Sequence, residues 1–215
     1  MTRSINRMSD AAARSPVIAI MAGGRGRRMG RDKTAIVIDG ATMLERVARA
    51  ALATGRRVII SGRPRPDLWP LDDMEFIPDA VFDRGPLAGI VAALNYTSSP
   101  VIAIAADMPL VTTEAIAWLI NISAESEVKD GLVVINNGRM EPLFSLYHPR
   151  VLPLAEKLLA DNRLALRELI ESRDFLMVDA PYSVVGLLRN INTPWELDDI
   201  TETRNAREIK TPECP

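Results

Sequence analysis

The chain has 215 residues, of which 47% are hydrophobic and 25% charged, and its 28 acidic and 26 basic side chains give a formal net charge of −2. These values are typical of a folded globular domain and exclude a globally disordered chain. They also argue against a dedicated nucleic-acid binder, which would carry a basic excess. A single histidine (His148) and a single cysteine (Cys214) exclude an internal disulfide and metal sites that need two histidines or several thiolates. Because cysteine is so rare, we expect a reducing, cytoplasmic environment.

The pattern along the chain indicates one domain with short extensions. Residues 1–15 carry three arginines against one aspartate and lack a sustained apolar face, so we interpret them as a flexible basic leader. No repeat, low-complexity tract or linker divides the rest, so we expect one domain over residues 16–206 and a tail over 207–215. The longest apolar runs are far shorter than the roughly 20 residues that a membrane span needs, and we expect no membrane partner.

Short apolar runs alternate with amphipathic segments, which predicts an α/β fold in which helices connect mostly parallel strands. We expect strands at residues 17–21, 36–38, 58–61, 75–77, 101–105, 132–136, 143–147, 175–178 and 184–188. We expect helices at residues 42–54, 87–96, 112–122, 151–159, 164–171 and 195–206.

Local signals support several of these elements. Thr42 followed by Glu45 predicts a capping box at the start of the first helix. The turn at Asn137-Gly138 predicts a hairpin between the strands on either side of it. Residues 101–105 are the most apolar run, as expected of a central strand that is buried on both faces of a parallel sheet.

The segment after the first strand, residues 22–33, contains four glycines and four arginines. Glycines let backbone N–H groups turn toward a bound anion, and Arg28 and Lys33 can add positive charge for phosphate oxygens. The spacing matches neither a P-loop nor a dinucleotide fingerprint, because Gly30 is followed by Arg31 and comes one residue too late. We therefore predict a phosphate-binding loop of another type, with a solvated charged loop as the alternative.

Polar residues follow three of the predicted strands. Ligands of open α/β sheets bind at the carboxyl ends of the strands, where Asp107 could hold Mg²⁺ against phosphates or serve as a turn residue. Asp79 could accept hydrogen bonds from a nucleobase or sugar, or cap a turn. Asn190 and Asn192, placed at the end of the late strand, could bind a polar second substrate or merely end that strand.

Five motifs in order resemble those of the molybdenum cofactor guanylyltransferases of the MobA type. The first strand and loop resemble the signature LAGG-x-x-x-RMG-x-DK through Met21-Ala22-Gly23-Gly24, Arg28-Met29-Gly30 and Asp32-Lys33. The later motifs are Gly85-Pro86-Leu87-Ala88-Gly89, Asp107-Met108-Pro109, Pro142-Leu143 and Asn190-Ile191-Asn192-Thr193-Pro194. The resemblance covers about residues 16–200, and five ordered motifs are far more specific than any one of them.

The resemblance implies a Rossmann-like three-layer nucleotidyltransferase fold and an enzyme that uses GTP and Mg²⁺ to attach GMP to molybdopterin, with release of pyrophosphate. The nucleotide-binding positions that it implies are Met21, Ala22, Gly23, Gly24, Lys33, Ser61, Asp79 and Asp107. Lys33, Arg28 and Asp107 would be catalytic and Asp107 would bind the metal, while Asn190 and Asn192 would lie on the pterin side. Molybdoenzymes or other proteins of cofactor biosynthesis would be its partners.

The sequence departs from the family pattern at Met21, where leucine is usual, at Ser61, where an asparagine contacts the nucleotide, and at Trp195, where an acidic residue is common. Two other functions stay open: a related nucleotidyltransferase that uses CTP or a sugar phosphate, and a non-catalytic adaptor that delivers cofactor. Gly23-Gly24 favours the guanylyl branch, since cytidylyl relatives usually have Ala-Ala-Gly at this position.

Overall fold

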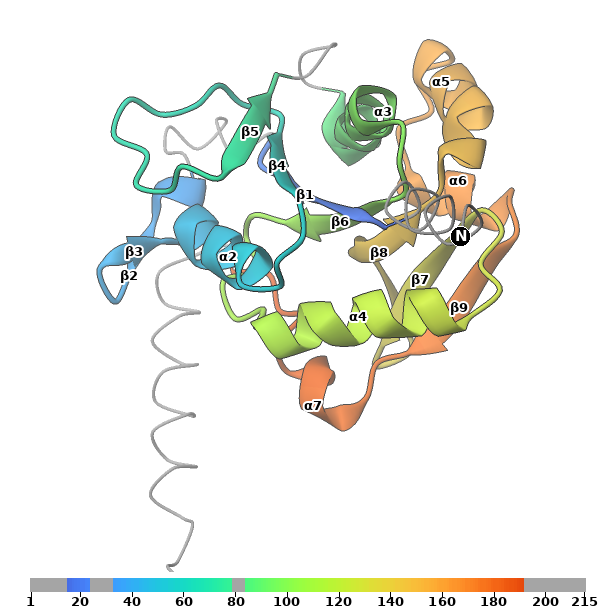
Figure 1. Ribbon diagram of the computed structural model, residues 1–215. Coiled ribbons are helices and arrows are strands. Elements are labelled where there is room, and N and C mark those ends of the chain that lie inside the picture. Colours follow the sequence, from blue (N-terminus) through green and yellow to red (C-terminus); the bar gives the residue numbers. More distant parts are fainter. Residues whose placement is uncertain (1–14, 24–32, 79–83, 192–215) are drawn as a thin grey trace, which may run out of the picture.

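The computed structural model describes residues 15–23, 33–78 and 84–191 (Figure 1). The predictions for Gly24, Arg28, Asp79 and Asn192 lie outside these residues. So do those for the leader, the tail and the last helix, and the domain boundaries stay a prediction.

Within the described part of the chain, seven strands form one sheet in the order β5-β4-β1-β6-β8-β7-β9. Their bounds are β1 (Val17–Met21), β4 (Val58–Ser61), β5 (Met74–Ile77), β6 (Val101–Ala105), β7 (Gly131–Asn136), β8 (Arg139–Tyr147) and β9 (Phe175–Asp179). Only β8 pairs antiparallel with its neighbours, and the other pairings in the sheet are parallel. The predicted mostly parallel sheet is confirmed, with β6 in its middle.

Helices cover both faces of this sheet, which gives three layers (Figure 1). On one face lie α2 (Met43–Leu52), α4 (Thr113–Glu125) and α7 (Tyr182–Val185), and on the other α3 (Gly85–Thr97), α5 (Leu152–Ala160) and α6 (Leu166–Glu171). Short 3₁₀ turns form η2 (Lys33–Ala35) and η3 (Pro149–Val151). Among the described helices, none is both long enough and apolar enough to cross a membrane.

The central strands supply both halves of the core because successive side chains alternate between the two faces. In β6, Ile102 and Ile104 pack under α2 and α4, while Val101 and Ala103 pack under α3. All five residues of β6 are buried, as are all five of β1. This rigid centre fixes where the carboxyl ends of β1 and β6 emerge from the sheet.

The segment before α2 folds as predicted. Thr42 and Glu45 form a complete capping box, in which the Thr42 hydroxyl accepts the Glu45 N–H and the Glu45 carboxylate accepts the Thr42 N–H. Upstream, β2 (Val37–Ile38) and β3 (Ala41–Thr42) form a small antiparallel hairpin. The hairpin and the cap together fix the start of α2 beside the chain that leads back to Lys33.

The predicted strand at residues 184–188 is wrong, because this segment forms the end of α7 and a turn at Gly186 and Leu187. The N–H of Val184 donates to the Pro181 carbonyl and the N–H of Leu187 to the Val184 carbonyl, both at 2.8 Å. Val184 and Leu188 are four residues apart and both enter the core under α4, which is a helical spacing. Asn190 is therefore not preceded by a strand.

A register shift separates β8 from β7 near the centre of their hairpin. Val133 is opposite Ser145, but Val134 is opposite Glu141, so three residues of β8 bulge out between these pairs. The fully buried Ser145 hydroxyl accepts the Val134 N–H at 3.2 Å and donates to the Glu141 carbonyl at 2.7 Å. One side chain thus replaces the ladder bonds that the bulge interrupts.

We expect Ser145→Ala to lower the free energy of unfolding by about 2 kcal/mol, because the buried N–H of Val134 and the partly buried carbonyl of Glu141 would each lose a partner. Urea denaturation of both proteins measures the difference. Ser123→Ala is the matched control, since in the described part of the chain the Ser123 hydroxyl bonds the Ile120 carbonyl of its own helix, α4. This change should cost less than about 0.5 kcal/mol; equal losses in the two variants would contradict the bridging role of Ser145.

Candidate functional site

The carboxyl ends of β1, β4 and β6 meet at one edge of the sheet. Met21 is paired with Ser61 on one side and with Ala105 on the other. Beyond the strands, the Ala22 N–H donates to the Ser61 carbonyl at 2.8 Å, and the Ala106 N–H donates to the Met21 carbonyl at 3.1 Å. The glycine segment that begins after Ala22 and the turn that carries Asp107 therefore start side by side.

Asp107 lies in a turn whose neighbouring residues are buried in the core. Its neighbours Ala106 and Met108 are buried in the core on the α2 and α4 face, and the Met108 N–H donates to the Ala105 carbonyl at 3.3 Å. The backbone carbonyl of Asp107 accepts the Ile191 N–H at 2.9 Å. Asp107 itself is only partly buried, so a fixed backbone holds this residue at the ligand-binding edge.

Ile191 connects Asp107 to the segment that begins with Lys33. Its fully buried side chain packs with Met43 at the start of α2, and Ile36 packs against the same cluster. The Met43 N–H also donates to the Ile36 carbonyl at 2.9 Å. Lys33 is the first residue of η2, three residues before Ile36. The cluster of Ile36, Met43 and Ile191 therefore connects the segment that begins with Lys33 to the Asp107 turn.

Of the two asparagines predicted to lie on the pterin side, Asn190 is within the described residues and Asn192 is not. Asn190 is exposed and directly precedes Ile191, so the structure brings it next to the Asp107 turn. The binding roles predicted for Met21, Ala22, Gly23, Ser61 and Asn190 stay predictions, although these residues all lie at or beside the same edge.

Ser61 has a structural contact that the sequence did not indicate. Its side chain is buried, and its hydroxyl donates to the Gly89 carbonyl in the first half of α3 at 3.2 Å. Gly89 ends the Gly-Pro-Leu-Ala-Gly motif, and Pro86 occupies the first turn of the helix. The bond therefore ties the end of β4 to α3, whose N-terminus has the partial positive charge that favours anions.

The donor set at this edge suits Mg²⁺, which proteins commonly bind through one or two carboxylates while substrate phosphates and water supply the other ligands. Asp107 offers such a carboxylate in the turn that starts beside Ala22, because the Ala106 N–H donates to the Met21 carbonyl. In residues 15–23, 33–78 and 84–191, no group of three or more His, Cys, Asp or Glu side chains lies close enough to hold a metal. A Mg²⁺ site at Asp107 would therefore need phosphate oxygens and water among its other ligands.

Two residues near the edge were missed by the sequence analysis. Arg63, just beyond β4, donates from Nη1 to the Thr34 hydroxyl in η2 at 2.6 Å. Glu141 directly precedes the bulge in β8, on the side of the Phe144–Ile104 pair that faces the edge carrying Asp107. The position of Arg63, a cation two residues after the end of a predicted strand, was a usable signal in the sequence. The sequence contains no signal for the bulge next to which Glu141 is half-buried.

Burial raises the pKa of Glu141 above its ordinary value near 4.5, although the Asn136 amide donates to its carboxylate at 3.1 Å. A raised pKa means that the folded protein holds the proton more tightly than the unfolded chain. The contribution of Glu141 to stability is therefore fully present below pH 4.5 and is lost as the pH rises through the folded-state pKa.

We expect Glu141→Gln to be more stable than the wild type at pH 7.5 but to lose this advantage at pH 4, because glutamine cannot ionise and keeps an acceptor for Asn136. Urea denaturation at the two pH values measures the effect. A stability difference that is the same at both would contradict the desolvation of this carboxylate.

The three layers and the mostly parallel sheet define an α/β protein of the class in which ligands bind at the carboxyl ends of the parallel strands. Residues 18–178 match the family model of the MobA-like NTP transferase domain, and the chain belongs to this family. It is a nucleotidyltransferase, as its motifs predict.

Relatives that match over most of their length are named molybdenum cofactor guanylyltransferases. The chain is 32% identical over 196 residues to the molybdenum cofactor guanylyltransferase of Rhizobium meliloti, covering 85% of this chain and 88% of the relative. It is 31% identical over 190 residues to the enzyme of the same name from Pseudomonas putida, covering 85% and 95%. The crystal structure of molybdopterin-guanine dinucleotide biosynthesis protein A from Archaeoglobus fulgidus superimposes with a TM-score of 0.71 at 24% identity, over 88% of this chain and 99% of that one. At this identity the structural likeness establishes the fold.

Proposed function

We propose that the protein transfers GMP from GTP to molybdopterin in a Mg²⁺-dependent reaction that releases pyrophosphate. The observation that carries the proposal is the common edge at which the glycine segment after β1 and Asp107 after β6 emerge, joined by the bond from Ala106 to Met21. The names of the relatives support the identity of the two substrates. Its location in the cytoplasm and its partners among molybdoenzymes or cofactor-biosynthesis proteins stay predictions.

The chemistry requires two polyanions to approach each other. An oxygen of the terminal phosphate of molybdopterin forms a bond to the α-phosphorus of GTP, and the bond from that phosphorus to the oxygen bridging to the β-phosphate breaks. Asp107 would hold Mg²⁺, which supplies positive charge to the crowded phosphate oxygens. Lys33 would add a fixed cation for the departing pyrophosphate, and Arg28, outside the described residues, would do the same.

Orientation is the other contribution that the chain makes. The Ala22 N–H already donates to the Ser61 carbonyl, so the N–H groups that would face a bound phosphate begin at Gly23, directly after a strand whose residues are all buried. Asn190 lies next to the residue that bonds the Asp107 carbonyl, which supports a role on the pterin side of the reacting phosphates. No side-chain nucleophile is needed, and we expect no covalent enzyme intermediate.

The direct test incubates the purified protein with GTP, Mg²⁺ and molybdopterin, with or without bound molybdenum. We expect stoichiometric pyrophosphate and a guanylylated pterin, measured by a coupled phosphate assay and mass spectrometry. Absence of both products with either form of the pterin would contradict the proposal.

Competition among GTP, CTP, UTP and ATP tests the choice of base, for which we expect GTP to bind most tightly. Tighter binding of CTP would instead favour a cytidylyl or sugar-phosphate nucleotidyltransferase. Stabilisation by GTP in a thermal-shift assay without any turnover would favour the non-catalytic adaptor.

A further inference from the structure

Arg63 joins two segments that are distant in sequence and that both border the proposed nucleotide site. Its Nη1 group donates to the hydroxyl of Thr34 at 2.6 Å, across 29 residues, and the bond is partly buried. Thr34 is the middle residue of η2, directly after Lys33. The bond therefore connects the end of β4 to the turn that begins with the lysine.

The Arg63 end of this connection is firmly supported by the sheet. Gly62, with a φ of +100°, turns the chain immediately after β4, and its N–H donates to the Ile77 carbonyl of β5 at 3.0 Å. Pro64 follows Arg63 and restricts its backbone to extended conformations. The arginine side chain thus projects from a backbone that is fixed on both sides.

The Thr34 end is a segment with little stability of its own. A 3₁₀ turn of three residues has poor hydrogen-bond geometry and cannot persist without outside contacts. Its downstream support is Ile36, which packs beside Met43 and Ile191. At Thr34 the guanidinium of Arg63 adds support from outside the turn, and its loss would loosen the turn that begins with Lys33.

We propose that Arg63 is a positioning residue of the nucleotide site, which acts through Thr34 to hold the Lys33 turn at the carboxyl edge of the sheet before GTP binds. The inference rests on the proposed function for the identity of the nucleotide. Because the turn is already ordered, GTP binding does not have to supply the free energy of ordering it. The effect therefore falls on GTP affinity more than on turnover at saturating GTP.

The test compares Arg63→Met, Thr34→Val, the double variant and Thr34→Ser. Valine matches threonine in shape but lacks the hydroxyl, whereas serine keeps it. We expect Arg63→Met and Thr34→Val each to raise the KM and the Kd for GTP about tenfold, with kcat changed less than about threefold. The double variant should be no weaker than the more affected single variant, and Thr34→Ser should stay close to the wild type.

Amide hydrogen exchange of the nucleotide-free proteins gives a readout that does not depend on catalysis. We expect residues 33–36 to exchange faster in Arg63→Met and Thr34→Val than in the wild type and in Thr34→Ser. Arg65→Met is the matched control, because it removes an arginine of the same loop whose exposed guanidinium pairs with Asp72. It should alter neither the exchange nor the KM.

Several outcomes would overturn the positioning role. Additive losses in the double variant, or a normal KM in Thr34→Val beside a raised one in Arg63→Met, would mean that Arg63 does not act through Thr34. Unchanged exchange at residues 33–36 would contradict it directly. Faster exchange in the variants, together with no guanylylated pterin from the wild type, would support the role of the Arg63–Thr34 bond in ordering the turn. That result would contradict the proposed function instead.

Discussion

Asp107→Asn is expected to lower GTP-dependent pyrophosphate release at least about a hundredfold while leaving the fold intact. The change removes the negative charge that would hold Mg²⁺, and the stabilisation of phosphate charge by a bound metal amounts to several kcal/mol. The fold should survive because the Asp107 backbone carbonyl, not its side chain, accepts the Ile191 N–H. Initial rates at saturating GTP and molybdopterin measure the loss, and circular dichroism checks the fold.

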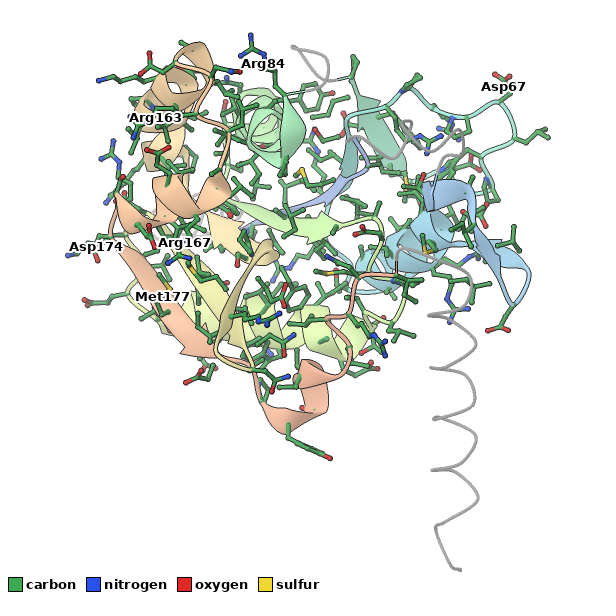
Figure 2. All side chains as sticks on the ribbon, turned by 180° about the vertical axis from the view of Figure 1, so that it is seen from behind. Asp67, Arg84, Arg163, Arg167, Asp174 and Met177 are labelled. Carbon is green, nitrogen blue, oxygen red and sulfur yellow. The ribbon has the colours of Figure 1, made fainter. Side chains whose placement is uncertain are left out.

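Asp174→Asn is the matched control for this change. Asp174 lies on the surface just before the start of β9 (Figure 2). It pairs with Lys129, and because β9 runs in the same direction as β6, it lies at the end of the sheet opposite to Asp107. We expect its turnover to equal that of the wild type. Equal turnover in Asp107→Asn and Asp174→Asn would show that the Asp107 carboxylate has no role in the reaction.

Gly131→Ala is expected to cost about 3 kcal/mol of stability or more. Gly131 begins β7 between two strands, and a Cβ at this position would lie 2.2 Å from Cε1 of Phe175 and 2.3 Å from the backbone oxygen of Leu146. The Phe175 ring packs edge-on against the buried Tyr147 ring, and the Leu146 oxygen belongs to a strand. Neither neighbour can yield without disturbing β8 or β9, so urea denaturation should reveal a large loss.

Gly186→Ala separates this steric effect from the general effect of replacing a glycine. Gly186 has a φ of −74°, and a Cβ there would meet no atom within 4 Å. We expect its stability to stay within about 0.5 kcal/mol of the wild type or to rise slightly. Similar losses at the two positions would show that the crowding at Gly131 does not determine its cost.

The elements that could be predicted from sequence are those whose signal is local. The apolar runs of β1 and β6, the capping box at Thr42 and the turn at Asn137-Gly138 each depend on neighbouring residues, and the structure confirms all of them. The strand predicted at residues 184–188 failed because two adjacent valines favour a strand locally, whereas burial of Val184 and Leu188 under α4 favours a turn of helix.

The site could be predicted only as far as topology allows. Parallel strands place their carboxyl ends at one edge, so the proximity of the segment after Met21 to Asp107 followed from the strand prediction. The bond from Arg63 to Thr34 and the desolvation of Glu141 arise from tertiary contacts, a loop folded against η2 and a three-residue bulge, respectively. Neither the bond nor the desolvation produces a periodic pattern in the sequence.

Titration of GTP into the wild type and Asp107→Asn, each with and without Mg²⁺, tests most directly whether the edge beside β1 and β6 holds a metal-bound triphosphate. We expect Mg²⁺ to tighten GTP binding to the wild type by about tenfold or more, and to leave the affinity of Asp107→Asn nearly unchanged. The same Mg²⁺ enhancement in both proteins would contradict a nucleotide site shared by the glycine segment and Asp107.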